Sequence, residues 1–296
     1  MIYKLKQKIR HSELGENIVK SLEKKPSLFL PLFSLMFKMR LAENCYEDGY
    51  LLADESKKFF EQNKEKIQTI LRVLADEESK NTFRKCLRYR ESFSFVPPFC
   101  KGTQYFPQDL LHLSKQEVLV DCGAYTGDSI LSFLKYTNNK YKKIVAFEPD
   151  ALSAKQLNAH NFPNCICLSC GVWNKKETLS FYTDGKGHST VEKEDWTPKH
   201  SEEWEKFPIQ LERIDDLPVC ADMTFLKMNL EGAELKALKG AEQTIRKNRP
   251  KLAICICHSD QDMIEIPLWI MSLNMGYKLY MRHYSLGKNG TVCYAL

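Results

Sequence analysis

The chain has 296 residues, of which 43% are hydrophobic and 27% charged, and its formal net charge is +5. This length and apolar content predict one large domain, or a domain with an accessory piece, and exclude a mainly disordered chain. No stretch approaches the roughly 20 consecutive apolar residues of a membrane-spanning helix. The excess of positive charge lies within residues 1–110, a mild bias that does not indicate a nucleic-acid partner.

The amino terminus and the cysteines indicate the cellular compartment. The first residues, MIYKLKQKIRHSELGE, are charged where a secretory signal has its apolar stretch. The eleven cysteines lie mostly in apolar runs such as NCICLSC and AICIC, as expected of reduced, buried thiols. We therefore expect a cytoplasmic protein. Cys165, Cys167 and Cys170 are conceivable zinc ligands, but the i, i+2 spacing is that of one strand face, so no metal is expected.

Residues 1–105 have the apolar spacing of helices and predict an α-helical accessory region. The stretch SLFLPLFSLMFKMRLAENCY is apolar nearly all round and predicts a buried or interface helix interrupted near Pro31. Further along, Phe59, Ile67, Ile70, Leu71 and Leu74 recur at helical intervals between charged residues. This region can serve as a lid, as the surface of a homodimer or as a structural cap.

From about residue 117 short apolar runs alternate with amphipathic stretches, the pattern of a parallel sheet with helices on both faces. The pattern predicts strands at 117–121, 143–148, 164–169, 223–228 and 251–257, and helices at about 127–137, 151–160, 234–247 and 260–274. An insertion between Val172 and Asp222 contains two strand-like pieces, TLSFYT and IQLERI. At the carboxyl end, YKLYMRHYS and TVCYAL flank a glycine-bearing turn and predict an antiparallel pair.

The stretch EVLVDCGAYTGDSI predicts a strand, a glycine turn and a helix. Gly123 and Gly127 permit a tight turn and close approach of a ligand, and Asp128 or Ser129 can cap the helix. Asp121 at the strand end favours a ligand with an ammonium group over a pyrophosphate. Glu148, which closes the next strand, can accept both hydroxyls of a ribose. S-adenosylmethionine carries both groups.

Five ordered motifs carry a resemblance to a known family: VDCGAYTGDSI, AFEPD, FLKMNLEGAELKALKGAEQTI, RPKLAICICH and YKLYMRHY. From roughly residue 70 to the end, the chain resembles the FkbM family of S-adenosylmethionine-dependent methyltransferases. The resemblance implies an α/β class I methyltransferase (Rossmann-like) fold over 106–296, with a mostly parallel sheet and a C-terminal antiparallel hairpin. It also implies O-methylation of sugar or polyketide hydroxyls.

The resemblance assigns cofactor-binding residues in four groups. The first cofactor loop comprises Asp121, Gly123, Ala124, Tyr125, Thr126, Gly127, Asp128 and Ser129. The ribose acid Glu148 is followed by Pro149 and Asp150. The stretch that meets the adenine edge is Cys170, Gly171 and Val172. Tyr105 and Phe106 resemble an aromatic pair that closes over the cofactor, although ordinary packing explains them equally well.

Methyl transfer from a sulfonium requires alignment of the acceptor oxygen and removal of its proton. In this architecture the carboxyl ends of the strands face the ligand crevice, which predicts Asn229, Glu231 and His258 as catalytic residues. Glu231 can orient or deprotonate the acceptor, and His258 is either a general base or a hydrogen-bonding strand end. Glu234 is interpreted as an acid that offsets a helix dipole. Arg282 and His283 either touch substrate or form local contacts.

Asn229 departs from the family pattern K-x-D-x-E-G, where Asp is usual. An amide cannot ionise and is a weaker metal ligand, which shifts proton removal toward Glu231 or His258 and disfavours a magnesium-assisted mechanism. We expect an O-methyltransferase acting on a hydroxyl of a sugar, glycan or related small metabolite. The alternative is a cofactor-binding regulatory or scaffolding subunit with weak or no activity.

Other reactions fit the sequence less well. The stretch VPPF at 96–99 has Val96 where amino-methylation of nucleic acids needs a hydrogen-bonding residue, and no Pro-Cys dipeptide is present for carbon methylation. The G-x-x-x-G spacing and the reversed tail disfavour a nicotinamide dehydrogenase. We expect the 184–206 insertion and the helical first third to form the acceptor surface.

Overall fold

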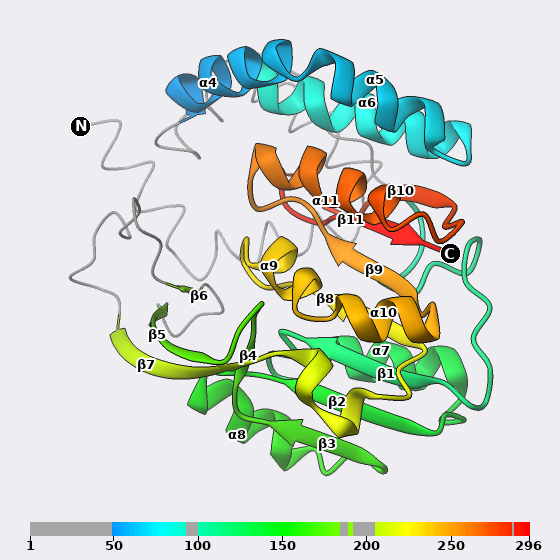
Figure 1. Cartoon of the computed structure of the whole chain (residues 1–296), viewed down its shortest axis with the longest axis vertical. Helices are drawn as coiled ribbons and strands as arrows, with labels where there is room; N and C mark the ends of the chain where they lie inside the picture. The colour runs from blue at the N-terminus through cyan, green and yellow to red at the C-terminus, as the bar shows by residue number, and fades with distance from the viewer. Residues whose placement is uncertain (1–48, 93–99, 184–188, 192–204, 286) are drawn as a thin grey trace, which may run out of the picture.

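The computed structural model describes residues 49–92, 100–183, 189–191, 205–285 and 287–296 (Figure 1). The expected helix around Pro31, the VPPF stretch and most of the 184–206 insertion lie outside these ranges. None of the helices within them combines the length and hydrophobicity that a membrane crossing requires.

Seven strands form the main sheet, in the order β10-β11-β9-β8-β1-β2-β3. All five strands of the α/β pattern are confirmed: β1 (Val118–Cys122), β2 (Lys143–Phe147), β3 (Cys165–Leu168), β8 (Phe225–Met228) and β9 (Lys251–Cys255). They run parallel. The tail forms the expected hairpin, because β11 (Thr291–Ala295) pairs antiparallel with both β10 (Leu279–His283) and β9.

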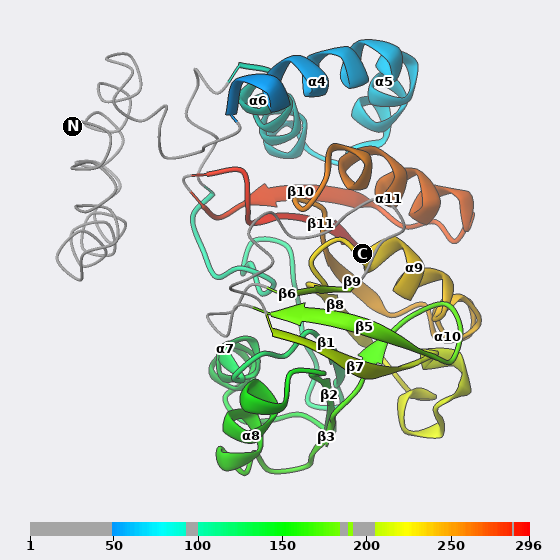
Figure 2. The same ribbon diagram turned by 90° about the vertical axis from the view of Figure 1, so that its left-hand side faces the viewer.

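Helices cover both faces of this sheet (Figure 2). The helices on one face are α7 (Asp128–Thr137) and α8 (Ala151–Ala159), and those on the other are α9 (Glu234–Lys239), α10 (Glu242–Asn248) and α11 (Asp260–Ser272). The single helix expected at 234–247 is two helices, interrupted at Gly240. A Cβ on Gly240 would lie 1.9 Å from the backbone oxygen of Trp173, so the close approach of these two segments requires glycine there.

Three N-terminal helices, α4 (Gly49–Gln62), α5 (Lys64–Val73) and α6 (Glu77–Ser92), form a layer beside β10 and α11 (Figures 1 and 2). Ile67, Ile70 and Leu71 are buried on α5, as their spacing predicts. The guanidinium of Arg90 on α6 donates to the Asp260 carboxylate at 2.7 Å and also to the backbone oxygen of Cys257. The helical layer therefore contacts the chain directly after β9.

The insertion between β3 and β8 forms a second sheet with the order β4-β7-β5-β6. Its strands are β4 (Gly171–Val172), β5 (Glu177–Thr183), β6 (Ser189–Val191) and β7 (Glu205–Glu212), and short 3-10 turns at Ile214–Asp216 and Pro218–Cys220 follow. Trp173, Phe181, Ile209, Leu211 and Ala233 pack together in a small apolar cluster against this sheet. The second sheet thereby adds an apolar wall to one side of the site.

Candidate active site

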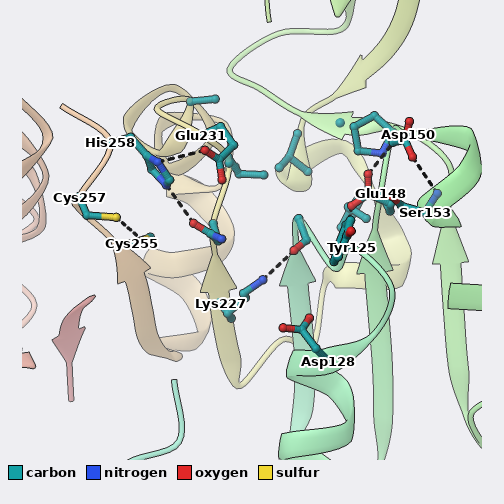
Figure 3. A pocket seen from close by; sticks show the side chains of 18 of the residues that line it. Tyr125, Asp128, Glu148, Asp150, Ser153, Lys227, Glu231, Cys255, Cys257 and His258 are labelled. Atoms are coloured by element: carbon teal, nitrogen blue, oxygen red, sulfur yellow. Dashed lines mark hydrogen bonds and ion pairs between the residues drawn. The ribbon is translucent and has the colours of Figure 1, made fainter. Parts of the chain in front are cut away.

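A cavity of about 400 Å³ opens at the carboxyl-terminal edge of the main sheet. Figure 3 shows its two sides, with Glu148, Asp150 and Ser153 on one and Glu231 and His258 on the other. The side chains that line it come from the ends of β1, β2, β8 and β9, from the second sheet and from the turn before β11. This placement agrees with the expected crevice at the strand ends.

Glu148 is fixed on the cofactor side of the cavity by backbone donors. Its two carboxylate oxygens accept from the N–H groups of Tyr125, at 2.8 Å, and Asp150, at 2.9 Å. Burial raises the pKa of Glu148, and these two hydrogen bonds oppose that rise. Asp150 in turn caps α8 by accepting from the Ser153 N–H. The carboxylate is therefore held in one orientation at the cavity wall.

Asp121 does not face the cavity, which corrects its expected contact with the cofactor. It lies opposite Lys227 in the register of β1 and β8, and the two side chains form a buried ion pair at 2.8 Å. The other carboxylate oxygen accepts from the Ser129 hydroxyl. Ser129 therefore does not cap α7, and neither does Asp128, because the cap residue Gly127 precedes the helix without a side-chain hydrogen bond.

Lys227 connects this buried pair to the cavity. Its ammonium group donates to the backbone oxygen of Gly123 at 2.7 Å and lies 5.0 Å from the ring centre of Tyr105. Gly123 has a φ of +79°, and a Cβ there would lie 2.0 Å from the Asn229 backbone oxygen. The glycine is therefore required by both its backbone conformation and its neighbour.

His258 is surrounded by polar side chains on the opposite side of the cavity. Its Nδ1 lies 3.3 Å from a Glu231 oxygen, and its Nε2 lies 3.2 Å from Glu234 and 2.9 Å from Asn229 Oδ1. Burial disfavours the charged ring, but the Glu234 charge and hydrogen bonds to both acids outweigh it and hold the pKa of His258 well above its usual range. Acceptors lie beside both ring nitrogens, an arrangement that favours the imidazolium form.

Glu234 does more than offset a helix dipole. It is fully buried, and besides His258 it accepts from the backbone N–H groups of Leu230, at 2.7 Å, and Gly232, at 3.0 Å. Burial opposes its ionisation, yet the His258 charge and these hydrogen bonds lower the pKa of Glu234. Glu231 and Gly232 occupy left-handed backbone positions, with φ of +53° and +93°. Glu234 thus fixes a tight turn that presents the Glu231 side chain, which is 36% exposed.

Two cysteines complete this side of the cavity. Cys255 and Cys257 line it, and their sulfurs are 3.2 Å apart. Cys257 also accepts from the Gly290 N–H at 3.2 Å. The hydrogen bond from Cys255 lowers the pKa of Cys257 to about 6; burial opposes this, while the His258 charge and the Gly290 N–H reinforce it.

Of the other expected cofactor-binding residues, about half reach the cavity. Those that line it are Tyr105, Gly123, Tyr125, Asp128, Pro149, Asp150, Gly171 and Val172. Phe106 packs in the core against Phe133 and Phe225 instead. Ala124, Thr126, Gly127, Ser129 and Cys170 are likewise not among the lining residues. The loop therefore contributes only Gly123, Tyr125 and Asp128 to the cavity.

Arg282 and His283 do not line the cavity, and both form local contacts, the second of the two predicted alternatives. Arg282 is 3% exposed and pairs with Asp76 and Asp109, each at 2.9 Å. The His283 ring is buried and makes a 2.8 Å hydrogen bond with the Thr291 hydroxyl. Both residues support the packing of β10 against its neighbours.

Sequence reasoning missed several lining residues. Cys255 and Cys257 are two residues apart at the end of a predicted strand. This spacing places both side chains on one strand face and was a usable signal. Lys227 stands two residues before Asn229 and so shares its strand face, another usable signal. The apolar wall carried no such signal, because its residues come from three separate segments of the insertion: Trp173 after β4, Phe181 on β5, and Ile209 and Leu211 on β7.

The fold and the site together define a class I methyltransferase dependent on S-adenosylmethionine. The methyltransferase FkbM domain matches residues 121–279, and the chain belongs to this family. A crystal structure of methyltransferase FkbM from Methylobacillus flagellatus KT superposes with a TM-score of 0.66 at 25% identity, covering 81% of this chain. The chain spans 60% of the length of that protein.

A curated relative gives a similar picture. Methyltransferase 1 of Beauveria bassiana (strain ARSEF 2860) is 25% identical over 187 residues, which cover 55% of this chain and 71% of the relative.

Proposed function

We propose that the protein transfers the methyl group of S-adenosylmethionine to a hydroxyl of a sugar, glycan or related small metabolite. The observation that carries the proposal is the Glu231 carboxylate, which is partly exposed in the cavity and lies 3.3 Å from the His258 ring. A carboxylate in this position can accept the proton that the hydroxyl loses as the new bond forms.

Glu148 would hold the ribose of the cofactor. Each of its oxygens already accepts one backbone N–H, and each retains capacity for a further hydrogen bond from a ribose hydroxyl. Because Asp121 is committed to Lys227, the ammonium group of the cofactor needs another acid. Asp128 lines the cavity and lies close enough to Lys227 to support its charge, so we assign the ammonium to Asp128.

Of the two candidate bases, the contacts favour Glu231. A general base must be unprotonated before the reaction, and the two acids beside His258 keep a proton on its ring. His258 therefore acts as a positioning residue that orients the Glu231 carboxylate. The Asn229 oxygen is occupied by His258 at 2.9 Å, so the proposed mechanism assigns Asn229 no part in proton transfer and requires no divalent cation.

Glu231→Gln tests this assignment. Labelled S-adenosylmethionine would be mixed with the protein and a panel of sugar nucleotides and glycans, and binding of S-adenosylhomocysteine would be measured by calorimetry. We expect transfer by the wild type, a loss of about 10²–10⁴-fold in Glu231→Gln, and unchanged cofactor binding. Glu242→Gln, on the exposed face of α10, is the matched control and should retain activity.

Asn229 supports one alternative function. With an amide where the family usually has an acid, the chain can be a cofactor-binding subunit with weak or no catalysis. Binding of S-adenosylhomocysteine without transfer to any acceptor in the panel would favour the subunit. Unchanged transfer by Glu231→Gln would refute the proposed base, and absence of cofactor binding by folded protein would refute both functions.

A further inference from the structure

The proposed mechanism leaves the thiols of Cys255 and Cys257 without a role. Both residues are buried and both line the cavity (Figure 3). Their sulfurs are 3.2 Å apart, and the Gly290 N–H donates to Cys257 at 3.2 Å. A hydrogen-bonded pair of thiols in the wall of a ligand cavity lies beside any small reagent that enters that cavity.

We propose that Cys255 and Cys257 form an oxidisable dithiol site, which a hydroperoxide converts to a disulfide and thereby weakens cofactor binding. The second part of this inference rests on the proposed function, because it assumes that the cofactor occupies this cavity.

The surroundings favour Cys257 as the sulfur that reacts first. Its sulfur accepts from the Gly290 N–H and shares a hydrogen bond with the Cys255 sulfur, and the His258 ring, which lies between two acids, is the next residue. These contacts stabilise the thiolate form, which is the nucleophile in thiol oxidation. They lower the pKa of Cys257, which favours the thiolate form.

The reaction balances with a hydroperoxide as the oxidant. The Cys257 thiolate attacks one peroxide oxygen, an S–O bond forms, the O–O bond breaks, and the leaving hydroxide or alkoxide takes up a proton. The resulting sulfenic acid is attacked by the sulfur of Cys255, which loses its proton as the S–S bond forms and water leaves. The two cysteines lose two electrons, and the peroxide gains them.

A metal site fits these residues less well. Cys255, Cys257 and His258 offer ligand atoms within 4.8 Å of one another, a set that would suit a soft metal ion. However, both ring nitrogens of His258 already contact Glu231, Glu234 and Asn229. Only the two thiols are left for a ligand, and a pair of adjacent thiols is the arrangement of a redox site.

Oxidation would alter the cavity in two ways. It removes the negative charge of Cys257 beside the His258 ring, and it weakens the sulfur as an acceptor for the Gly290 N–H. Gly290 lines the cavity together with Ser285 and Asn289, so the turn before β11 loses one of the contacts that hold it at the cavity wall. Both changes act on the site that is proposed to bind the cofactor.

The chain contains a matched pair for comparison. Cys165 and Cys167 have the same i, i+2 spacing on β3, and their sulfurs are 3.8 Å apart. They lie on the edge strand of the main sheet, do not line the cavity and are more exposed than Cys255 and Cys257. Oxidation that depends only on spacing and exposure would therefore affect Cys165 and Cys167 first.

The test treats the reduced full-length protein with stoichiometric hydrogen peroxide, alkylates the remaining thiols and measures tryptic peptides by mass spectrometry. The peptide 252–278 contains Cys255 and Cys257 and no other cysteine. We expect it to lose two hydrogen masses in the wild type, and to lose them more slowly when S-adenosylhomocysteine is bound. Cys255→Ser should accumulate a sulfenic acid at Cys257, and Cys257→Ser should show neither product.

Calorimetry with S-adenosylhomocysteine gives the second measurement. We expect oxidation to weaken its binding about tenfold or more, dithiothreitol to restore it, and Cys165→Ser to behave as the wild type. The dithiol site is refuted if peptide 252–278 stays reduced while the peptide with Cys165 and Cys167 oxidises. The proposed effect of the disulfide on cofactor binding is refuted if the disulfide forms and the affinity for S-adenosylhomocysteine is unchanged. Neither measurement needs an acceptor, so a failure to methylate hydroxyls would be distinguished from a failure of this inference.

Discussion

His283 ends β10 and is buried, and His258 lies three residues beyond the end of β9 and is mostly buried, but their surroundings are opposite in character. His258 lies between the carboxylates of Glu231 and Glu234 and contacts the Asn229 amide. His283 makes a hydrogen bond with Thr291, and no acid in the described part of the chain forms an ion pair with it. The surroundings of His258 favour a charged ring, and those of His283 favour a neutral ring.

The difference shows that the neighbours of a histidine, and not its position at a strand end, decide its chemistry. Acidic neighbours outweigh the burial of His258 and raise its pKa, whereas burial, with the charge of Arg90 nearby, lowers the pKa of His283 to about 4. His258 can therefore orient a carboxylate in the site, and His283 contributes only to packing of the hairpin.

The largest expected effect is on stability. His258→Leu would leave the fully buried Glu234 carboxylate without its cation, and we expect the free energy of unfolding to fall by about 3–5 kcal/mol. His283→Leu would remove one neutral hydrogen bond, with an expected loss of about 1 kcal/mol. Urea unfolding of both variants, followed by circular dichroism, measures the difference.

A double variant separates lost charge pairing from lost packing. In His258→Leu/Glu234→Gln no buried charge remains unpaired, so we expect it to recover most of the stability lost in His258→Leu. Equal losses in the two histidine variants would contradict the comparison between the two rings.

The two histidines should also respond to pH in opposite directions. We expect the His258 ring to remain protonated at neutral pH and the His283 ring to be neutral above pH about 4, as nuclear magnetic resonance of the ring nitrogens would report. Glu231, Glu234 and Cys257 are the titratable groups that face His258, and the charge of Arg90 acts on His283.

The sign of the stability change follows from linkage. The pKa of His258 is raised in the folded state. Its contribution to the free energy of unfolding is therefore fully present below about pH 6.5, the pKa in the unfolded state, and is lost as pH rises through the folded-state pKa. His283 has a lowered pKa, so stability is lost as pH falls from about 6.5 toward about 4. His258→Gln and His283→Gln should flatten the respective slopes of the wild type. Slopes of the same sign would contradict the assignment.

Asn229→Asp should give the smallest effect. The new carboxylate would retain the contact with His258 Nε2 and add a third acid near the ring, so the pKa of His258 should rise further. Methyl transfer should change by less than about tenfold, because the proposed base, Glu231, is retained. Asn248→Asp, at the exposed end of α10, serves as the control. A change of 10²-fold or more in Asn229→Asp would give Asn229 a larger part in catalysis than proposed.

Much of the fold followed from the sequence, because apolar periodicity reports which side chains are buried. The five parallel strands, their helices and the antiparallel tail fall where the pattern predicts them. The nearness of Glu231 and His258 was also predictable, since the carboxyl ends of neighbouring parallel strands meet at one edge. The break at Gly240 was not, because it depends on the Trp173 backbone of a distant segment.

The errors in the site have a common cause in long-range pairing. Asp121 was expected at the cofactor, but the pairing of β1 with β8 places it directly opposite Lys227. The sequence of either strand alone does not determine that register. For Arg282 the sequence left contact with substrate or a salt bridge open, and its acids, Asp76 and Asp109, are 206 and 173 residues away along the chain. Local patterns locate strand ends, whereas the direction of a charged side chain depends on its partner.

At position 231 the turn and the proposed reaction favour different residues, because the backbone conformation suits glycine and the reaction needs a carboxylate. A side chain other than glycine at a φ of +53° costs roughly 1–2 kcal/mol relative to the ordinary helical region. Glycine at this position would relax the turn and remove the carboxylate in the same step. Selection for thermal tolerance alone would therefore tend to erase the acid, and retaining it requires compensating stability elsewhere, such as the contacts that Glu234 makes beneath the turn.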